Sequence, residues 1–282
     1  MAEVRKPRPQ HVFEVVATEQ VSPHMVRVWF ESMTFDAFAA AADERASTDL
    51  YMKMLFARPE LGLEQPYDLE GLRRRLAPED MPSRRTYSIR EIDRESRRIA
   101  VDFVVHGDEG IAGPWAAQAQ AGDRVTVSSP GGMYAPSPEV AAHLFFGDES
   151  ALPAIAASID ALGGDAVATA VIEVGSEHDE IALNAPAGVE VRWLHRDGAP
   201  HGSALVAAVE AMPAPSDVVD VFAHGEREAI KRLRAVIHGE WGIPRERLSI
   251  SAYWAAGRAE DTFQAEKRDP IGQIFEPDPA AG

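Results

Sequence analysis

One short segment, residues 84–90, carries side chains suited to holding a flat, anionic ligand. It reads Arg-Arg-Thr-Tyr-Ser-Ile-Arg and places Arg85, Tyr87 and Ser88 close together. In a strand, Arg85 and Tyr87 would share one face and Ser88 would lie on the other, unless a bulge intervenes. A flavin dinucleotide needs an aromatic surface, hydroxyl partners and a cation for its pyrophosphate. The segment therefore indicates a redox enzyme, against the alternative of an ordinary strand with a core tyrosine.

A small-residue turn further along supplies a second part of such a site. Residues 105–116 read Val-His-Gly-Asp-Glu-Gly-Ile-Ala-Gly-Pro-Trp-Ala and lead into a helix expected over residues 114–119. Proline suits the first helical turn because its missing N–H would have been unpaired anyway. The free N–H groups and dipole of a helix N-terminus favour a phosphate. We interpret the segment as the pyrophosphate-binding turn, although a plain hairpin-to-helix turn has the same composition.

Two later turns predict a nicotinamide-nucleotide site. Residues 146–153 read Phe-Gly-Asp-Glu-Ser-Ala-Leu-Pro, and residues 222–228 read Phe-Ala-His-Gly-Glu-Arg-Glu. Each follows an expected strand and opens a helix, which is where dinucleotides bind in open parallel sheets. The first turn lacks the full Gly-x-Gly-x-x-Gly fingerprint. Ordinary strand-to-helix loops are the alternative.

The sequence leaves the choice between NADH and NADPH open. Glu173 and Glu177 follow the second expected strand of this region and would favour a ribose hydroxyl over a 2′-phosphate. Arg192 and Arg196 lie on the next strand and loop, where they would favour the phosphate.

Composition excludes several classes of protein. The chain has no cysteine, which excludes disulfides, thiolate nucleophiles and cysteine-ligated metal clusters. Its formal net charge of −17 argues against nucleic acid as a partner. No apolar run approaches the length of a membrane span, and the N-terminus lacks a signal-peptide core. No set of His, Asp and Glu residues around His106 indicates a metal site, and His106 could instead hydrogen-bond the flavin or its ribityl chain. A cytoplasmic protein, monomeric and without stable membrane insertion, is expected.

The elements that must position these residues form two groups. Short strands separated by turns predict an antiparallel barrel, at residues 12–17, 25–30, 49–56, 86–92, 98–105 and 124–128. After a proline-rich stretch, strands alternate with helices and predict a doubly wound parallel sheet. We expect an FAD-binding β-barrel domain over residues 1–136, an NAD(P)H-binding α/β domain over 137–257, and a C-terminal arm or tail over 258–282.

Taken in this order, the motifs resemble the siderophore-interacting protein family of FAD-dependent ferric-siderophore reductases, which are related to ferredoxin reductases. The resemblance covers nearly the whole chain. It rests on residues 51–56, 85–88, 101–107, 112–116, 122–123, 147–153, 223–226 and 253–257.

The resemblance implies a set of cofactor-binding residues. For FAD they are Arg85, Thr86, Tyr87, Ser88, Asp102, Val105, His106, Ala112, Gly113 and Trp115, with Tyr253, Trp254 and Gly257 closing over it. The nucleotide turns add Asp148, Glu149, Ser150, Gly225 and Glu226.

The resemblance also implies a basic pocket for an anionic ferric chelate, with Lys53 as its lysine. Gly131 or Gly132 stands where many members carry a basic residue, so we expect Arg258 and Lys267 to compensate.

The implied activity is a ferric-siderophore reductase with FAD as cofactor and NADPH or NADH as electron donor. No side chain is expected to act as a catalytic acid or base, because the flavin carries the electrons. A general NAD(P)H:flavin or quinone reductase and a non-catalytic siderophore-binding protein are the alternatives.

Overall fold

The computed structural model describes residues 9–107 and 110–275. The chain divides into two compact units, residues 1–133 and 134–282, close to the domain boundary expected from the sequence. Each unit has its own hydrophobic core. No helix in the described part of the chain is long and apolar enough to cross a membrane.

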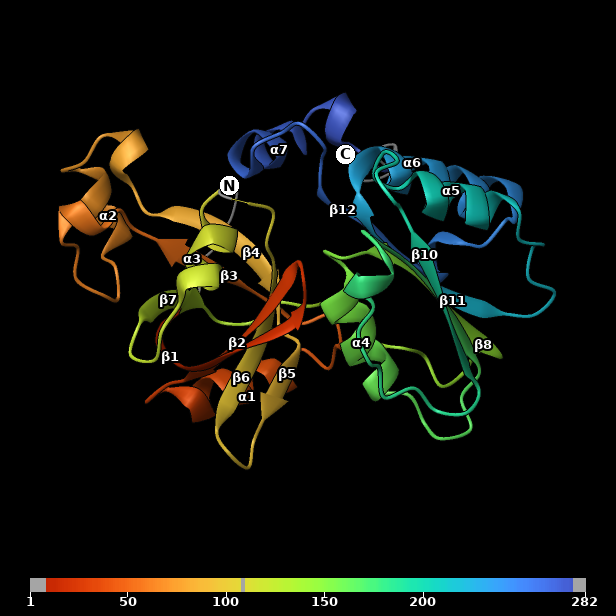
Figure 1. The fold of residues 1–282 in the computed structure, drawn as a ribbon, viewed down its shortest axis with the longest axis horizontal. Coiled ribbons are helices and arrows are strands. Elements are labelled where there is room, and N and C mark those ends of the chain that lie inside the picture. The colour runs from red at the N-terminus through yellow and green to blue at the C-terminus, as the bar shows by residue number, and fades with distance from the viewer. Residues whose placement is uncertain (1–8, 108–109, 276–282) are drawn as a thin grey trace, which may run out of the picture. The chain divides into compact units, whose positions relative to one another are not determined.

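The first unit is built on one antiparallel sheet, whose strands follow the order β4-β3-β7-β1-β2-β6-β5 (Figure 1). The backbone N–H of Arg90, just after β4, donates to the carbonyl of Ala100 in β6 at 2.8 Å. The two ends of the sheet therefore meet, and the antiparallel barrel expected from the sequence is confirmed. The strands are β1 (Gln10–Ser22), β2 (Met25–Glu31), β3 (Tyr51–Phe56), β4 (Ser83–Ser88), β5 (Glu91–Asp93), β6 (Arg98–Val104) and β7 (Arg124–Ser128).

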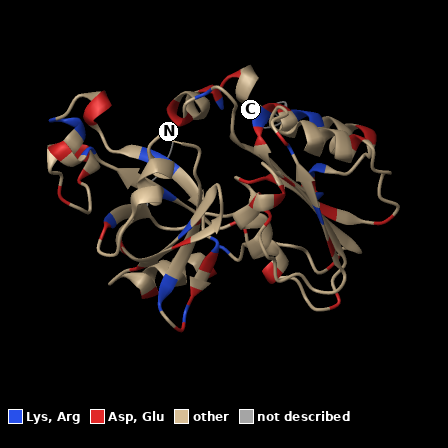
Figure 2. Cartoon of the chain, in the orientation of Figure 1, with Lys and Arg blue, Asp and Glu red and all other residues tan. Residues whose placement is uncertain are grey.

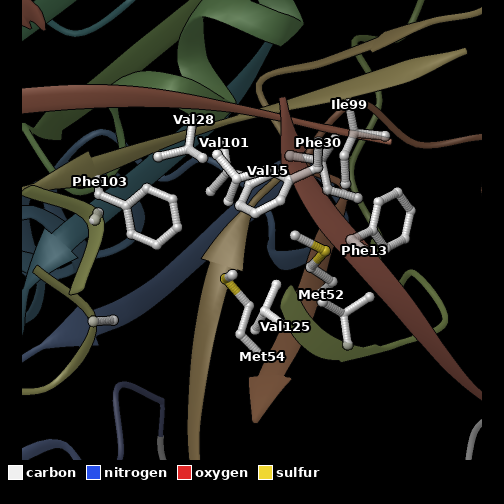
Figure 3. Close-up of a cluster of buried hydrophobic side chains, with 14 of the residues drawn as sticks. Phe13, Val15, Val28, Phe30, Met52, Met54, Ile99, Val101, Phe103 and Val125 are labelled. Carbon is white, nitrogen blue, oxygen red and sulfur yellow. The ribbon is translucent and has the colours of Figure 1, made fainter. Parts of the chain in front are cut away.

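Alternate residues of these strands fill the barrel. Phe13, Phe30, Met52 and Ile99 come from four different strands and are fully buried together (Figure 3). Burying a side chain of this size contributes about 2 kcal/mol. The core therefore fixes which face of each strand points inward.

Three helices accompany the barrel: α1 (Phe35–Asp43), α2 (Leu69–Arg73) and α3 (Ala112–Gln118). The proline-rich connection from residue 57 to residue 82 carries α2 and packs its own small cluster on Leu55, with Tyr67 and Leu72. The helix expected over 114–119 begins two residues earlier, at Ala112.

The second unit is a parallel sheet in the order β10-β9-β8-β11-β12. Helices α5 and α6 lie side by side on one face and α4 lies on the other (Figure 1), so the predicted doubly wound sheet is confirmed. Because every strand pair is parallel, all carboxyl ends share one edge. The elements are β8 (Ala142–Asp148), α4 (Leu152–Asp160), β9 (Ala168–Val174), β10 (Val189–His195), α5 (Ser203–Glu210), β11 (Val219–Glu226), α6 (Arg227–Arg234), β12 (Leu248–Trp254) and α7 (Glu260–Glu266).

Helix α6 continues into a π-helical stretch, Ala235–Glu240. Residues 258–275, expected as an arm or tail, pack in the second unit, where Phe263 is buried against Ala252 and Ala255. The remaining residues of that segment, 276–282, lie outside the described residues.

Candidate functional site

β4 carries the aromatic and cationic residues of the expected flavin site. Its register with β3 is unbroken, so no bulge disturbs the alternation of its side chains. Tyr87 lies opposite the buried Met52 and therefore shares the face of the core, together with Arg85. Ser88 lies opposite Tyr51 on the other face. The alternation predicted from the sequence is observed.

Tyr87 and Trp115 lie at the margin of the barrel core. The ring of Tyr87 is 4.4 Å from that of Phe103, between centroids, and Phe103 is 5.9 Å from Trp115. Trp115 in turn stacks parallel to Phe30 at 6.2 Å. Both Tyr87 and Trp115 are only partly buried, so each leaves part of its ring outside the core. The buried Phe103 thus contacts aromatic rings from both β4 and α3.

The start of α3 has the features of a phosphate-binding turn. A Cβ on Gly113 would lie 3.2 Å from the carbonyl oxygen of Val104, so glycine lets the helix start pack against the end of β6. Among the described residues, no side chain caps α3, whose N-cap is Ile111. The first-turn N–H groups therefore have no side-chain acceptor there, which suits them to an anion. Asp108 and Glu109 of the same turn lie outside the described residues.

Four further residues expected to bind FAD lie within β4, just after β6 and at the start of α3. The N–H of Val105 donates to the carbonyl of His24 at 2.8 Å, which fixes the chain just after β6. His106 follows and is exposed, Ala112 is buried at the start of α3, and Thr86 is exposed on β4.

Asp102 has a structural partner that the sequence reading missed. Its carboxylate is fully buried and accepts two hydrogen bonds from the Arg27 guanidinium, at 2.7 and 2.9 Å. The hydrogen bonds to Asp102 raise the pKa of Arg27. The two residues are register partners on β2 and β6, 75 positions apart in the chain. In this structure Asp102 joins two strands instead of facing a ligand.

Lys53 lies on the outer face of β3, between the buried Met52 and Met54. Its backbone N–H donates to the hydroxyl of Ser128 at 3.1 Å, and its register partner on β4 is Thr86. Lys and Arg residues are scattered among Asp and Glu along the barrel's elements (Figure 2).

Gly132 is one of the two glycines that stand where many family members carry a basic residue. A Cβ built on it would meet the hydroxyl of Ser47 and lie 3.1 Å from an oxygen of Asp49. A side chain here would therefore require the side chains of Ser47 and Asp49 to move.

In the second unit, Asp148 joins three strand ends at the carboxyl edge of the sheet. One of its oxygens accepts from the N–H and the hydroxyl of Ser150, at 2.9 and 2.5 Å. The other accepts from the N–H of Glu226 and the indole N–H of Trp254, both at 2.8 Å. Burial raises the pKa of Asp148, and these hydrogen bonds oppose the rise. The expected nucleotide turn is therefore held together by its own carboxylate.

Gly225 and Glu226 complete this arrangement at the end of β11. Gly225 has φ +150, and a Cβ there would lie 2.6 Å from an oxygen of Asp148. Glu226 is the N-cap of α6, because its carboxylate accepts from the N–H groups of Glu228 and Ala229 at 2.7 and 3.0 Å. Its second oxygen accepts from Ala256 at 3.1 Å.

Glu149, Glu173 and Arg196 form a buried ion-pair network. Arg196 binds Glu149 at 2.7 Å and Glu173 at 3.2 Å. Burial alone would lower the pKa of Arg196, and its two carboxylate partners raise it above the usual value. Glu173 is fully buried and also accepts from the N–H groups of Gly202 and Leu205, at 2.7 and 2.9 Å. The suggestion that Glu173 binds a ribose hydroxyl is therefore wrong, because both its oxygens hold the start of α5.

His224, the residue before Gly225, is buried between aromatic rings. It stacks on Phe222 at 3.9 Å and meets Tyr253 edge-on at 4.8 Å. One ring nitrogen lies 2.9 Å from the Ser249 hydroxyl. Burial lowers the pKa of His224 to about 3, so the ring stays neutral at physiological pH.

The C-terminal residues expected to bind cofactor or substrate have partners within the second unit. Trp254, besides its bond to Asp148, meets the His201 ring edge-on at 4.8 Å. Gly257 has φ +70, a conformation that favours glycine. Arg258 forms an ion pair with Glu266 at 2.9 Å, and the Lys267 ammonium lies 4.6 Å from the Phe263 ring centroid.

An antiparallel barrel followed by a doubly wound parallel sheet is the fold of ferredoxin reductases: the solved ferredoxin reductase of carbazole 1,9a-dioxygenase matches with a TM-score of 0.60 at 15% identity, over 89% of this chain and 71% of that chain.

Comparison with known sequences identifies the family within this fold. Residues 14–134 match the siderophore-interacting FAD-binding domain, and residues 140–257 match the siderophore-interacting protein family. The chain belongs to the siderophore-interacting protein family, as its motifs indicated.

Three similar proteins illustrate the family. The uncharacterized protein Rv2895c of Mycobacterium tuberculosis is 41% identical over 276 residues, which cover 93% of this chain and 96% of that protein. Ferric vibriobactin reductase ViuB of Vibrio cholerae is 28% identical over 278 residues, covering 97% of this chain and 99% of ViuB. The crystal structure of a siderophore utilization protein from T. fusca matches with a TM-score of 0.74 at 34% identity, over 90% of this chain and 95% of that chain.

Proposed function

We propose that this protein is an FAD-dependent reductase that uses NADH or NADPH to release iron from ferric siderophores. The observation that carries the proposal is the start of α3, which no side chain of the described residues caps and whose Trp115 contacts the same Phe103 ring as Tyr87. The turn that Asp148 holds at the carboxyl edge of the parallel sheet lies where dinucleotides bind in such sheets. The reductase ViuB, similar over nearly its whole length, supports the same activity.

The chain's own residues would bind and orient the flavin. Arg85 and the N–H groups at the start of α3 would hold the pyrophosphate, because both offer positive potential. The exposed parts of Tyr87 and Trp115 would lie against the ring system. Ser88 would hydrogen-bond a polar edge of the flavin.

Bound FAD would supply the redox chemistry, as an acceptor of hydride from the nicotinamide and a donor of single electrons. One nicotinamide nucleotide would thus reduce two iron(III) chelates to iron(II) and release one proton. Iron(II) binds hard-oxygen chelates more weakly than iron(III), so reduction releases the metal. No side chain of the chain need transfer a proton in this scheme.

Lys53 is the residue proposed to attract the anionic chelate. It is half-buried beside Thr86 and Ser128, so its charge would be little screened near a ligand on this face. Arg258 and Lys267 are weaker candidates because Glu266 and the Phe263 ring already hold them.

An anaerobic assay tests the proposal. The purified protein is loaded with FAD and mixed with NADH or NADPH and a ferric siderophore, in the presence of an iron(II) trap. We expect the flavin absorbance to bleach and iron(II) to appear, with Lys53→Gln raising the KM for the chelate about tenfold, or about 1.4 kcal/mol.

Arg73→Gln is the matched control, because it also removes one positive charge from the first unit at an exposed position on α2. Failure of both nucleotides to bleach the flavin would contradict the proposal. Bleaching without preferential release of iron(II) would favour a general flavin or quinone reductase. Chelate binding without bleaching would favour a non-catalytic siderophore-binding protein.

A further inference from the structure

A polar cavity opens at the carboxyl ends of β9 and β10 in the second unit. It has a volume of about 330 Å³ and is lined by Ser176, Glu177, His178, His195 and Asp197. The proposed catalytic scheme makes no use of these five residues.

The topology of the sheet places this cavity at the adenosine end of a bound dinucleotide. The strand order reverses between β8 and β11, so a dinucleotide would cross the carboxyl edge beside the turn after β8. β9 is the second strand of this unit in chain order, and the adenosine ribose lies at the end of the second strand in such sheets. Selection between a free ribose hydroxyl and a 2′-phosphate would therefore take place here.

The loops that form the cavity are tied together by their backbones. The N–H of Arg196 donates to the carbonyl of Val174 at 2.9 Å, and the N–H of Asp197 donates to that of Gly175 at 3.0 Å. Asp197 itself has φ 47, an unusual conformation for a residue other than glycine. The backbone at Asp197 is thus fixed next to the end of β9.

The arginines that could neutralise a 2′-phosphate are already bound to carboxylates. Arg192 and Arg196 are the only arginine or lysine residues in the segment 174–198. Arg192 donates twice to Glu190, at 2.7 and 2.9 Å. Arg196 has a side chain only 9% exposed and is held by Glu149 and Glu173. Binding a phosphate through Arg196 would require breaking this buried network, whereas the exposed Arg192–Glu190 pair would open at little cost.

The exposed charges that do line the cavity are acidic. Glu177 has a side chain 75% exposed, with the imidazole of His178 4.0 Å away, and Asp197 is exposed as well. The other histidine, His195, lies 2.7 Å from the carboxylate of Glu180, which would balance its charge if it were protonated. Carboxylates accept hydrogen bonds from ribose hydroxyls and repel a phosphate dianion.

We propose that this cavity binds the adenosine ribose through its free 2′- and 3′-hydroxyls and makes the enzyme selective for NADH over NADPH. The inference rests on the proposed function, because it assumes that a nicotinamide nucleotide binds this sheet. Glu177 and Asp197 are the specificity-determining residues, as acceptors for the hydroxyls and as repulsive charges against the 2′-phosphate.

Binding and reduction together test this inference. Calorimetry with the FAD-loaded protein compares 5′-AMP with 2′,5′-ADP, and anaerobic flavin bleaching compares NADH with NADPH. We expect 2′,5′-ADP to bind at least about tenfold more weakly than 5′-AMP, and NADH to reduce the flavin at least about tenfold more efficiently, because two like charges act on the phosphate. Equal or tighter binding of 2′,5′-ADP, or equal use of NADPH, would overturn the inference and leave the reductase proposal standing.

Charge-reversal variants distinguish a local effect of the cavity carboxylates from an effect of the protein's overall charge. In Glu177→Arg and Asp197→Arg we expect the NADH:NADPH ratio to fall about tenfold, mainly through stronger binding of 2′,5′-ADP. Glu246→Arg is the control, because it makes the same charge change before β12, at the opposite edge of the sheet, and should leave the ratio unchanged. An equal change in all three variants would overturn the assignment to the cavity. If neither AMP nor either nucleotide acts on the protein, both the inference and the proposed function fail.

Discussion

The two turns expected to hold dinucleotides are built in opposite ways. The turn after β8 is held by Asp148, whose two oxygens accept four hydrogen bonds, and the nearby start of α6 is capped by Glu226. The start of α3 has no side-chain cap within the described residues and is positioned by the fit of Gly113 against β6. The turn after β8 has its hydrogen-bonding groups satisfied by Asp148, whereas the start of α3 has N–H groups that no described side chain accepts. Changes at Asp148 should therefore affect stability, and changes at α3 should affect flavin affinity.

The largest effect should follow from removing the carboxylate that holds the strand ends. Asp148→Ala leaves the N–H of Glu226 and the indole N–H of Trp254 without their acceptor, and we expect a loss of about 4 kcal/mol in the free energy of unfolding. Urea denaturation of the apoprotein would measure it. Ser150→Ala, which removes a single hydroxyl bond, should cost about 1 kcal/mol. A loss below 1 kcal/mol for Asp148→Ala would show that the turn does not depend on this residue.

A smaller effect should appear in the pH dependence of stability. His224 must stay neutral when folded, since burial lowers its pKa to about 3, whereas in the unfolded chain it titrates near 6.5. Protonation thus favours the unfolded state, so this contribution is full above pH 6.5 and is lost as the pH falls toward 3. Between pH 7.5 and pH 5 the loss from His224 should be about 2 kcal/mol.

His224→Ala tests this directly, because the fall in unfolding free energy from pH 7.5 to pH 5 should shrink by about 2 kcal/mol. The buried His11 and His143, whose pKa values burial also lowers, would account for part of the remaining fall. His195→Ala, at an exposed position, is the control. An unchanged slope in His224→Ala would mean that the histidine is not held neutral by the fold.

The smallest effect on stability should come from giving α3 the cap that it lacks. Ile111→Asp supplies a carboxylate to the first-turn N–H groups and should stabilise the apoprotein by up to about 1 kcal/mol. The same carboxylate would compete with the pyrophosphate, so FAD affinity should fall about tenfold, as measured by fluorescence titration. Ile111→Asn offers a cap without charge and should weaken FAD less. Unchanged FAD affinity in Ile111→Asp would place the pyrophosphate elsewhere.

Much of the fold could be predicted from local patterns. Alternation identified the barrel strands and placed Arg85 and Tyr87 on one face, because side-chain direction in a strand depends only on neighbours in the chain. The alternation of strands with helices identified the parallel sheet, because a helix is the usual connection between two parallel strands. The packing of residues 258–275 was missed, since their polar composition hides Phe263, the buried side chain of α7, which packs against Ala252 and Ala255.

The roles of the charged residues could not be predicted in the same way. Asp102 was expected to bind a ligand from the family resemblance, Glu149 from its place in the nucleotide turn, and Glu173 from its place after the second expected strand. Their actual partners are Arg27, 75 residues from Asp102, and Arg196, 47 and 23 residues from the two glutamates. No spacing rule links positions so far apart.

By itself, the sequence determined the order of barrel and parallel sheet and the family, because these depend on periodicity and short segments. Only the tertiary structure decided which charges are available to a ligand. It paired Arg192 and Arg196 with Glu190, Glu149 and Glu173, and it left Glu177 and Asp197 lining the cavity at the end of β9. The physical reason is that a charge acts on a ligand only when folding has not already placed an opposite charge against it.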